Sequence, residues 1–186
     1  MKRLNVKAVT LILIFLLFGS STYVFSNDLT RSIPLQGHGS LILKYPDSWK
    51  EVITQSGQNM PPTIKLTSDK ENQFELLITP LWNKNSNKPF EEEQIKELLE
   101  KDGKEMLPSA AEPVLAIETF KGTNAAGYYF VLTDKAPKPN EFKFCYRMGI
   151  KVGSLLLSVT LLSNDKDSED IKSAFAVLKK VIHFEE

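Results

Sequence analysis

The sequence predicts an α+β fold in which a central antiparallel sheet of about six to seven strands is flanked by helices. Three observations support this prediction. Apolar and polar residues alternate at period two in several short segments, which is typical of half-buried strands. Short polar connections join successive strands and favour antiparallel pairing. Two longer segments carry apolar residues at helical spacing, so the expected architecture is an α/β/α sandwich.

Three or four strands are expected before the first helix. Leu41–Tyr45 alternates in hydrophobicity, and the Pro-Asp-Ser sequence at 46–48 turns the chain toward Trp49. The next predicted strands cover residues 50–54, 63–67 and 74–78. Pro80 limits further pairing of the last one, because proline has no amide hydrogen to donate. A polar loop, Asn83–Pro89, follows.

The first helix is predicted from Phe90 to Lys101, with a continuation to Met106 left open. Apolar residues at helical spacing form one face, and they are Ile95, Leu98, Leu99 and Met106. Glu-to-Lys pairs at i,i+4 mark the solvated face, each contributing about 0.2–0.5 kcal/mol. These pairs are Glu92–Lys96, Glu97–Lys101 and Glu100–Lys104. Gly103 offers a C-terminal end, in which case the third pair does not form.

Four more strands and a second helix complete the pattern. The strands are predicted over residues 114–121, 127–133, 142–148 and 155–161. Asp167 is the expected N-cap of the last helix, because aspartate accepts hydrogen bonds from the first free backbone amides. The helix carries an apolar stripe that should pack on the sheet, formed by Ile171, Phe175, Leu178 and Ile182.

Residues 1–26 are predicted to be a signal peptide. Three basic residues precede the apolar segment 8–18, and compact residues stand at the last and third-last positions of Val24-Phe25-Ser26. We therefore expect cleavage between Ser26 and Asn27; an earlier cut after Ser21, or an uncleaved membrane anchor, is the alternative. Residues 27–186 then form a single domain in the periplasm or outside the cell.

Composition excludes several functional classes. The chain has 23 basic and 23 acidic residues, and removal of the leader leaves a mildly acidic domain with no reason to bind nucleic acid or anionic lipid. One Cys rules out a disulfide within the chain and a Cys-rich metal site. With two His, a multi-histidine metal centre is not expected either. We expect no cofactor, no metal and, after cleavage, no stable membrane insertion.

Three segments carry a resemblance to a known family. Leu41–Trp49 (LILKYPDSW) looks like an opening strand with a Pro-x-x-Trp turn, residues 127–153 like a central hairpin, and residues 155–182 like a last strand, acidic break and closing helix. Over most of the chain this pattern resembles the PsbP-like superfamily, which includes the extrinsic PsbP protein of photosystem II and bacterial envelope proteins of the DcrB type. The resemblance implies a small accessory domain, usually non-enzymatic, that docks on larger partners.

Trp82 is the main candidate for a partner contact. It stands where a strand runs into a polar loop, and a partly exposed Trp beside a loop suits a binding role. The alternative is burial in the core, which is the expectation for Trp49 after its Pro turn. Lys84 lies in the same loop, and Lys138 lies in the basic, proline-stiffened segment 135–139, so both are further candidates.

Other chemical candidates have simpler structural explanations. Cys145 shares a strand face with Lys143 and Arg147, yet no resolving Cys is present and a buried structural thiol is expected. His38 fits a tight turn, and His183 is placed to meet the negative end of the last helix. Segment 165–170 (DKDSED) has oxygens that calcium uses, but it lacks the EF-hand Gly and terminal Glu, so helix capping explains it.

No catalytic motif emerges from the sequence. In particular, no Gly-x-Ser-x-Gly elbow is present to support serine hydrolysis. We therefore expect an exported, non-catalytic accessory protein that binds or helps assemble an envelope protein through loops at the ends of the sheet. The alternatives are an envelope hydrolase and a carrier of a small ligand, for which an apolar cavity between sheet and helix would be the sign.

Overall fold

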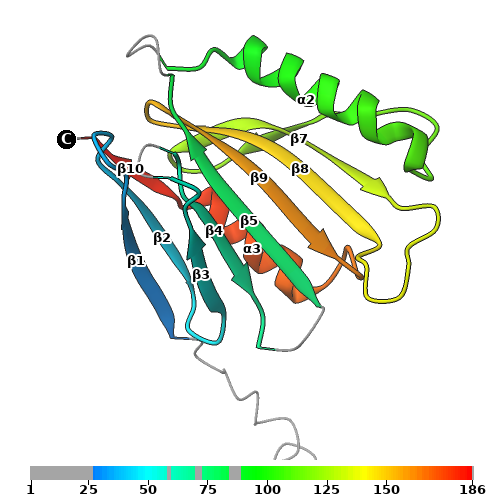
Figure 1. Ribbon diagram of the computed structural model, residues 1–186, viewed down its shortest axis with the longest axis horizontal. Coiled ribbons are helices and arrows are strands. Elements are labelled where there is room, and N and C mark those ends of the chain that lie inside the picture. The colour runs from blue at the N-terminus through cyan, green and yellow to red at the C-terminus, as the bar shows by residue number, and fades with distance from the viewer. Residues whose placement is uncertain (1–26, 58–59, 70–72, 84–88, 186) are drawn as a thin grey trace, which may run out of the picture.

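The computed structural model in Figure 1 describes residues 27–57, 60–69, 73–83 and 89–185. The first half contains five strands and a helix: β1 (Asp28–Pro34), β2 (Ser40–Pro46), β3 (Lys50–Thr54), β4 (Thr63–Thr67), β5 (Phe74–Leu81) and α2 (Glu92–Met106). The second half contains the 3₁₀ turn η1 (Leu107–Ser109), β6 (Glu118–Lys121), β7 (Ala125–Thr133), β8 (Phe144–Val152), β9 (Leu155–Ser163), α3 (Glu169–Lys179) and β10 (Ile182–Phe184).

The strands form two antiparallel sheets. The large sheet has seven strands in the order β3-β4-β5-β9-β8-β7-β6, and the small sheet has the order β1-β2-β10. In the large sheet, β9 lies at the centre and pairs with both β5 and β8. Pairing of β5 with β4 ends at Ile78, two residues before Pro80, whereas pairing with β9 continues to Leu81. The sequence-based α+β prediction is therefore confirmed, with a small second sheet added.

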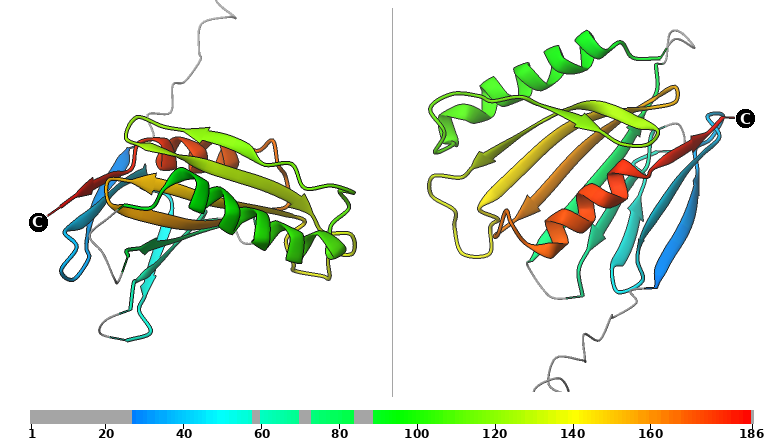
Figure 2. Two further views of the ribbon diagram at one scale, coloured as in Figure 1. Left: turned by 90° about the horizontal axis from the view of Figure 1, so that it is seen from above. Right: turned by 180° about the vertical axis from the view of Figure 1, so that it is seen from behind.

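Helices cover the two faces of the large sheet (Figure 2). α3 lies on one face, together with the small sheet, and buries Ile171, Ala174, Val177 and Leu178 in the main core. α2 lies on the other face over β7 and β8, where a Cβ on Gly149 would come within 2.6 Å of Ile95. This alternation of faces follows from the period-two pattern, since successive side chains of a strand point to opposite sides. Trp49 is buried against Phe74, with 4.6 Å between ring centroids, as predicted.

The first helix continues through Gly103 to Met106. Gly103 is buried, and a Cβ there would lie 2.5 Å from the side chain of Leu115, so the missing side chain makes room for packing rather than ending the helix. Because the helix continues, the Glu100–Lys104 pair forms, with 3.8 Å between carboxylate oxygen and ammonium nitrogen. Of the two ends that the sequence left open, the continuation to Met106 is confirmed, because close packing and not a turn accounts for this glycine.

The last helix differs from its prediction at both ends. Ser168 is the N-cap, and its hydroxyl accepts a hydrogen bond from the Ile171 amide, whereas Asp167 stands one residue too early. Ile182 belongs to β10 instead of the helical stripe, because the helix ends at Lys179 and the chain then pairs with β2. Strand β1 was also missed, and β6 is shorter than predicted, beginning at Glu118.

Candidate functional site

Trp82 lies at the end of β5, beside the turn that joins β1 to β2. Its half-buried indole stacks on the ring of His38, with 4.3 Å between centroids and 25° between planes. His38 reaches this position because Gly37 and Gly39, on either side, adopt positive φ angles of 70° and 73°. A left-handed backbone is accessible to glycine at little cost, so the Gly-His-Gly sequence forms a tight turn that presents the imidazole.

A cleft of about 430 Å³, the Trp82 cleft, opens beside this aromatic pair. Its lining residues are Ile33, Pro34, Gln36, His38, Ile53, Gln55, Met60, Pro62 and Trp82. Among the described residues, the lining includes no Asp, Glu, Lys or Arg, although a quarter of the chain is charged. Ile53 and Met60 are 46% and 47% exposed, which is high for large apolar side chains. The cleft is therefore suited to an uncharged, apolar group.

The C-terminal strand supports this site from behind. The His183 Nε2 donates a hydrogen bond to the His38 carbonyl at 2.8 Å, and the His183 side chain is 1% exposed. Its ring also faces Gly153, where a Cβ would stand 2.8 Å from Nδ1. The expected contact with the end of α3 is thus replaced by contacts with two turns. The His38 backbone, and with it the Trp82 stack, is fixed by β10.

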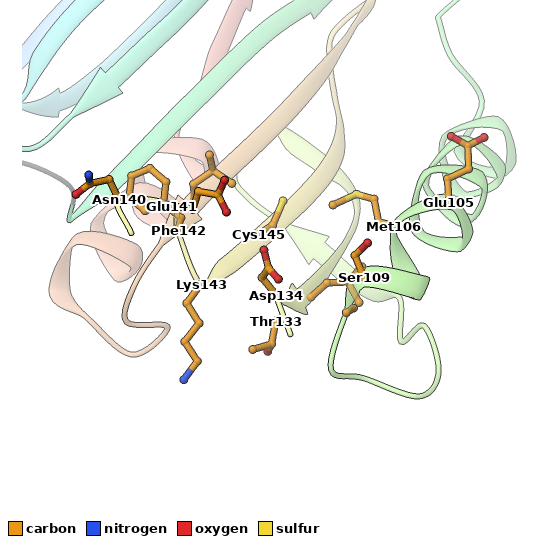
Figure 3. Close-up of a pocket in the computed structure, with 13 residues that line it drawn as sticks. Glu105, Met106, Ser109, Thr133, Asp134, Asn140, Glu141, Phe142, Lys143 and Cys145 are labelled. Carbon is orange, nitrogen blue, oxygen red and sulfur yellow. The ribbon is translucent and has the colours of Figure 1, made fainter. Parts of the chain in front are cut away.

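A second hollow, the helix–sheet cleft, lies where α2 ends over the large sheet (Figure 3). Its volume is about 630 Å³. Its lining residues are Glu105, Met106, Ser109, Ala110, Leu132, Thr133, Asp134, Asn140, Glu141, Phe142, Lys143, Cys145 and Leu162. Cys145 is half-buried here, less enclosed than the buried thiol that the sequence led us to expect.

Burial raises the pKa of the Cys145 thiol, and the nearby Arg147 guanidinium only partly offsets this by lowering it. Arg147 is itself engaged by Asp102 on α2, with 2.8 Å between Nη2 and Oδ2. Both histidines lie at the other end of β8, since His183 faces Gly153 just beyond that strand and His38 bonds to His183. Cys145 therefore has neither a lowered pKa nor an imidazole partner, the two features of an activated thiolate.

We predict slow alkylation of Cys145 in the folded protein. A raised pKa leaves less thiolate at neutral pH, so iodoacetamide should alkylate Cys145 more slowly in the folded protein than in the urea-unfolded chain. The difference between the two alkylation rates should become smaller as the pH rises. Mass spectrometry of the single Cys at several pH values measures both rates. A folded-state rate at neutral pH that equals the unfolded-state rate would contradict the prediction.

Of the two lysine candidates, one lies outside the described residues and the other lies away from Trp82. Lys84 lies outside the described residues, as does Ser26 on one side of the expected cleavage point, whereas the Asn27 carbonyl accepts a hydrogen bond from Asp47. Lys138 is exposed and paired with Glu141, with 3.8 Å between Nζ and Oε1. The Lys138 loop leads into Phe144, which pairs with Ser163, the last residue of β9. Trp82 instead follows Leu81, which pairs with Leu156, next to the first residue of β9. Trp82 and Lys138 thus lie at opposite ends of the sheet.

Segment 165–170 serves as a turn before α3. The Asp165 Oδ1 accepts a hydrogen bond from the Asp167 amide, and the Asp165 carbonyl accepts one from the Ser163 hydroxyl. Within the described ranges, no three His, Cys, Asp or Glu side chains gather as a metal site. In the same part of the chain, no helix combines the length and apolar character required to cross a membrane.

Comparison with known proteins supports the fold. No family model matches the sequence, and no curated protein matches it. Among solved structures, the solution structure of cyanobacterial PsbP (CyanoP) from Synechocystis sp. PCC 6803 is similar, with a TM-score of 0.55 and 13% identity. The match covers 90% of this chain and 99% of the cyanobacterial chain. At this identity the likeness concerns architecture, and it confirms the resemblance found in the sequence: the chain has a PsbP-like fold.

Proposed function

We propose that this protein is an exported, non-catalytic accessory protein that docks on an envelope protein through the Trp82 cleft. The observation that carries the proposal is the half-buried Trp82, held against His38 beside two exposed apolar side chains, Ile53 and Met60. Tryptophan is enriched among residues that dominate binding energy, and such residues sit in well-packed pockets surrounded by weaker contacts.

The chemistry of the cleft favours a protein partner. The described lining residues carry no charge, so they do not select a partner by its charge. The affinity for the partner increases when one of its apolar side chains displaces water from the cleft. The aromatic pair is also held in place before binding, because the His183 bond fixes the His38 backbone. Less conformational entropy is then lost on association, which raises affinity for a given contact area.

The position of the cleft suits a protein delivered by an N-terminal leader. Asp28, at the start of β1, pairs with Pro46, whereas Ile33 and Pro34, at its far end, line the cleft. Seven residues of strand separate the two ends by about 20 Å. The cleft therefore stays accessible whether the expected leader is cleaved after Ser26 or retained as an anchor.

We predict that Trp82→Ala strongly reduces a specific crosslink. A photoreactive residue placed at Ile53, in the protein expressed in its native host, should yield one dominant adduct that mass spectrometry identifies. Trp82→Ala should lower that adduct severalfold, because truncation of a central Trp typically costs about 2 kcal/mol or more of binding energy. The mature N-terminus is read from the same sample and tests cleavage before Asn27.

Val114 supplies the matched control. It is 69% exposed and lies between η1 and β6, away from the Trp82 cleft. A photoreactive residue at Val114 should not give the same adduct, and Val114→Ala should leave the Ile53 adduct unchanged. The proposal fails if folded Trp82→Ala protein, checked by circular dichroism, still forms the adduct in full. Absence of any adduct would instead call for substrate screening for the alternative hydrolase.

A further inference from the structure

The floor of the helix–sheet cleft is apolar and continuous across three strands. Leu132 of β7 is directly opposite Cys145 of β8, which in turn is opposite Leu162 of β9. These three side chains share the face of the sheet on which α2 packs. Met106, at the end of α2, and Phe142, in the loop before β8, form the two walls. Figure 3 shows the Met106 side chain directed toward Cys145 across the opening.

Both walls are held by backbone hydrogen bonds. The Lys135 amide donates to the Ser109 carbonyl at 3.1 Å, and the Lys135 ammonium donates to the Pro108 carbonyl at 3.1 Å. At the base of the loop, the Asp134 amide donates to the Lys143 carbonyl at 2.8 Å. The 134–143 loop is thus fastened to η1 and closed at its base, next to the start of β8. The cleft is consequently formed before any ligand arrives, as ligand pockets usually are.

The mouth of the cleft has one carboxylate, that of Asp134, close to Cys145 (Figure 3). Two other carboxylates are among the lining residues, but Figure 3 shows Glu105 directed away from Cys145, and Glu141 pairs with Lys138. The Lys143 ammonium lies 5.3 Å from the centroid of the Phe144 ring, and Figure 3 shows its side chain directed away from Cys145. The Lys135 ammonium donates to the Pro108 carbonyl, and Asp134 is in no ion pair with any described residue. The Asp134 carboxylate is therefore open to a cation in the cleft.

We propose that the helix–sheet cleft binds a small apolar molecule that carries one positive charge, such as an aryl-methylammonium compound. An apolar body would lie on the Leu132–Cys145–Leu162 floor, and its ammonium would face Asp134 at the mouth (Figure 3). The volume of about 630 Å³ falls within the range of small-molecule sites. This site is at the opposite end of the sheet from the Trp82 cleft, so the inference does not depend on the proposed protein partner.

Three probes of one shape test the inference. 2-Naphthylmethylammonium, 2-naphthylmethanol and 2-naphthoate are titrated into the purified exported protein, with NMR shifts and protection of Cys145 from alkylation as readouts. We expect binding of the ammonium probe at the cleft, weaker binding of the alcohol, and the weakest binding of the carboxylate. The exposed Asp134 carboxylate should favour the ammonium over the alcohol by about threefold at low salt, and by less at high salt.

Paired variants test separately how the shape of the cleft and its charge contribute to probe binding. Leu162→Trp fills the floor and should weaken all three probes, whereas Leu77→Trp, at a half-buried position on the same face of the neighbouring β5, should not. Asp134→Asn should remove the preference for the ammonium probe and leave alcohol binding unchanged; Asn keeps the acceptor for the Ala136 amide. Glu105→Gln, at a carboxylate that is directed away from Cys145, should keep the preference. The inference is overturned if no probe protects Cys145, or if the ammonium and the alcohol bind equally to the unmodified protein.

Discussion

Replacing Phe130 with Ala should lower the free energy of unfolding by about 3–5 kcal/mol, the usual cost of removing a buried phenyl ring. Phe130 is fully buried in a small cluster with Leu99, Ala110 and Leu132, apart from the main core. This cluster, together with the partly buried hydrophobic side chains packed against it, holds α2 against β7, so loss of the ring leaves a cavity between them. Urea denaturation followed by circular dichroism gives the free energy.

The control for this change is the same substitution at an exposed site. Phe184, at the end of β10, is 59% exposed, and Phe184→Ala should change the free energy of unfolding by no more than about 0.5 kcal/mol. Equal effects at the two positions would show that the cluster beneath α2 contributes no more than a surface contact. Because Ala110 lines the helix–sheet cleft, Phe130→Ala should also weaken probe binding there.

Replacing Gly39 with Ala should cost about 2–4 kcal/mol of stability, from backbone strain and steric overlap together. Gly39 has a φ of 73°, and a Cβ there would stand 1.8 Å from the Phe184 carbonyl oxygen. Relief of this overlap requires β10 to move away from β2. His183 would then lose its hydrogen bond to the His38 carbonyl, so we also expect a change in Trp82 fluorescence.

Gly37 is the matched position for this experiment. It has a φ of 70°, but a Cβ there would meet nothing within 4 Å, so Gly37→Ala should carry the conformational penalty alone, about 1 kcal/mol. The difference between the free energies of unfolding of the two variants measures the cost of the steric overlap with β10. If the two variants unfold at the same denaturant concentration, the close approach of the turn to β10 is not a source of stability.

The two clefts separate the proposed activities in space. The Trp82 cleft lies beside the turn between β1 and β2, and the helix–sheet cleft lies at the far end of the sheet, where Phe144 pairs with Ser163. Among the described residues, the first is lined without Asp, Glu, Lys or Arg and is supported by β10, whereas the second has Asp134 at its mouth and is supported by α2. Substitutions at Trp82 and at Leu162 should therefore act independently, as changes at distant sites usually do.

The sequence by itself determined the α+β class, most strand positions, both helices and the burial of Trp49. These features follow from local patterns, because period-two and helical spacing report which side of an element faces the core. It also selected Trp82 from its place at a strand end. The neighbour that completes that site, His38, lies 44 positions earlier in the chain. The Gly-His-Gly sequence predicted a turn, but no local pattern indicated that this turn would pack against the end of the strand that carries Trp82.

Tertiary structure decided the features that depend on distant contacts. Strand β1 forms because β2 offers an edge, and Ile182 leaves the helical stripe because β2 offers another edge on its opposite side. Gly103 remains inside α2 because Leu115 occupies the space that a side chain would take. The helix–sheet cleft exists because α2 ends before the 134–143 loop closes over the sheet. In each case a residue remote in sequence supplies the partner, and spacing along the chain carries no information about such a partner.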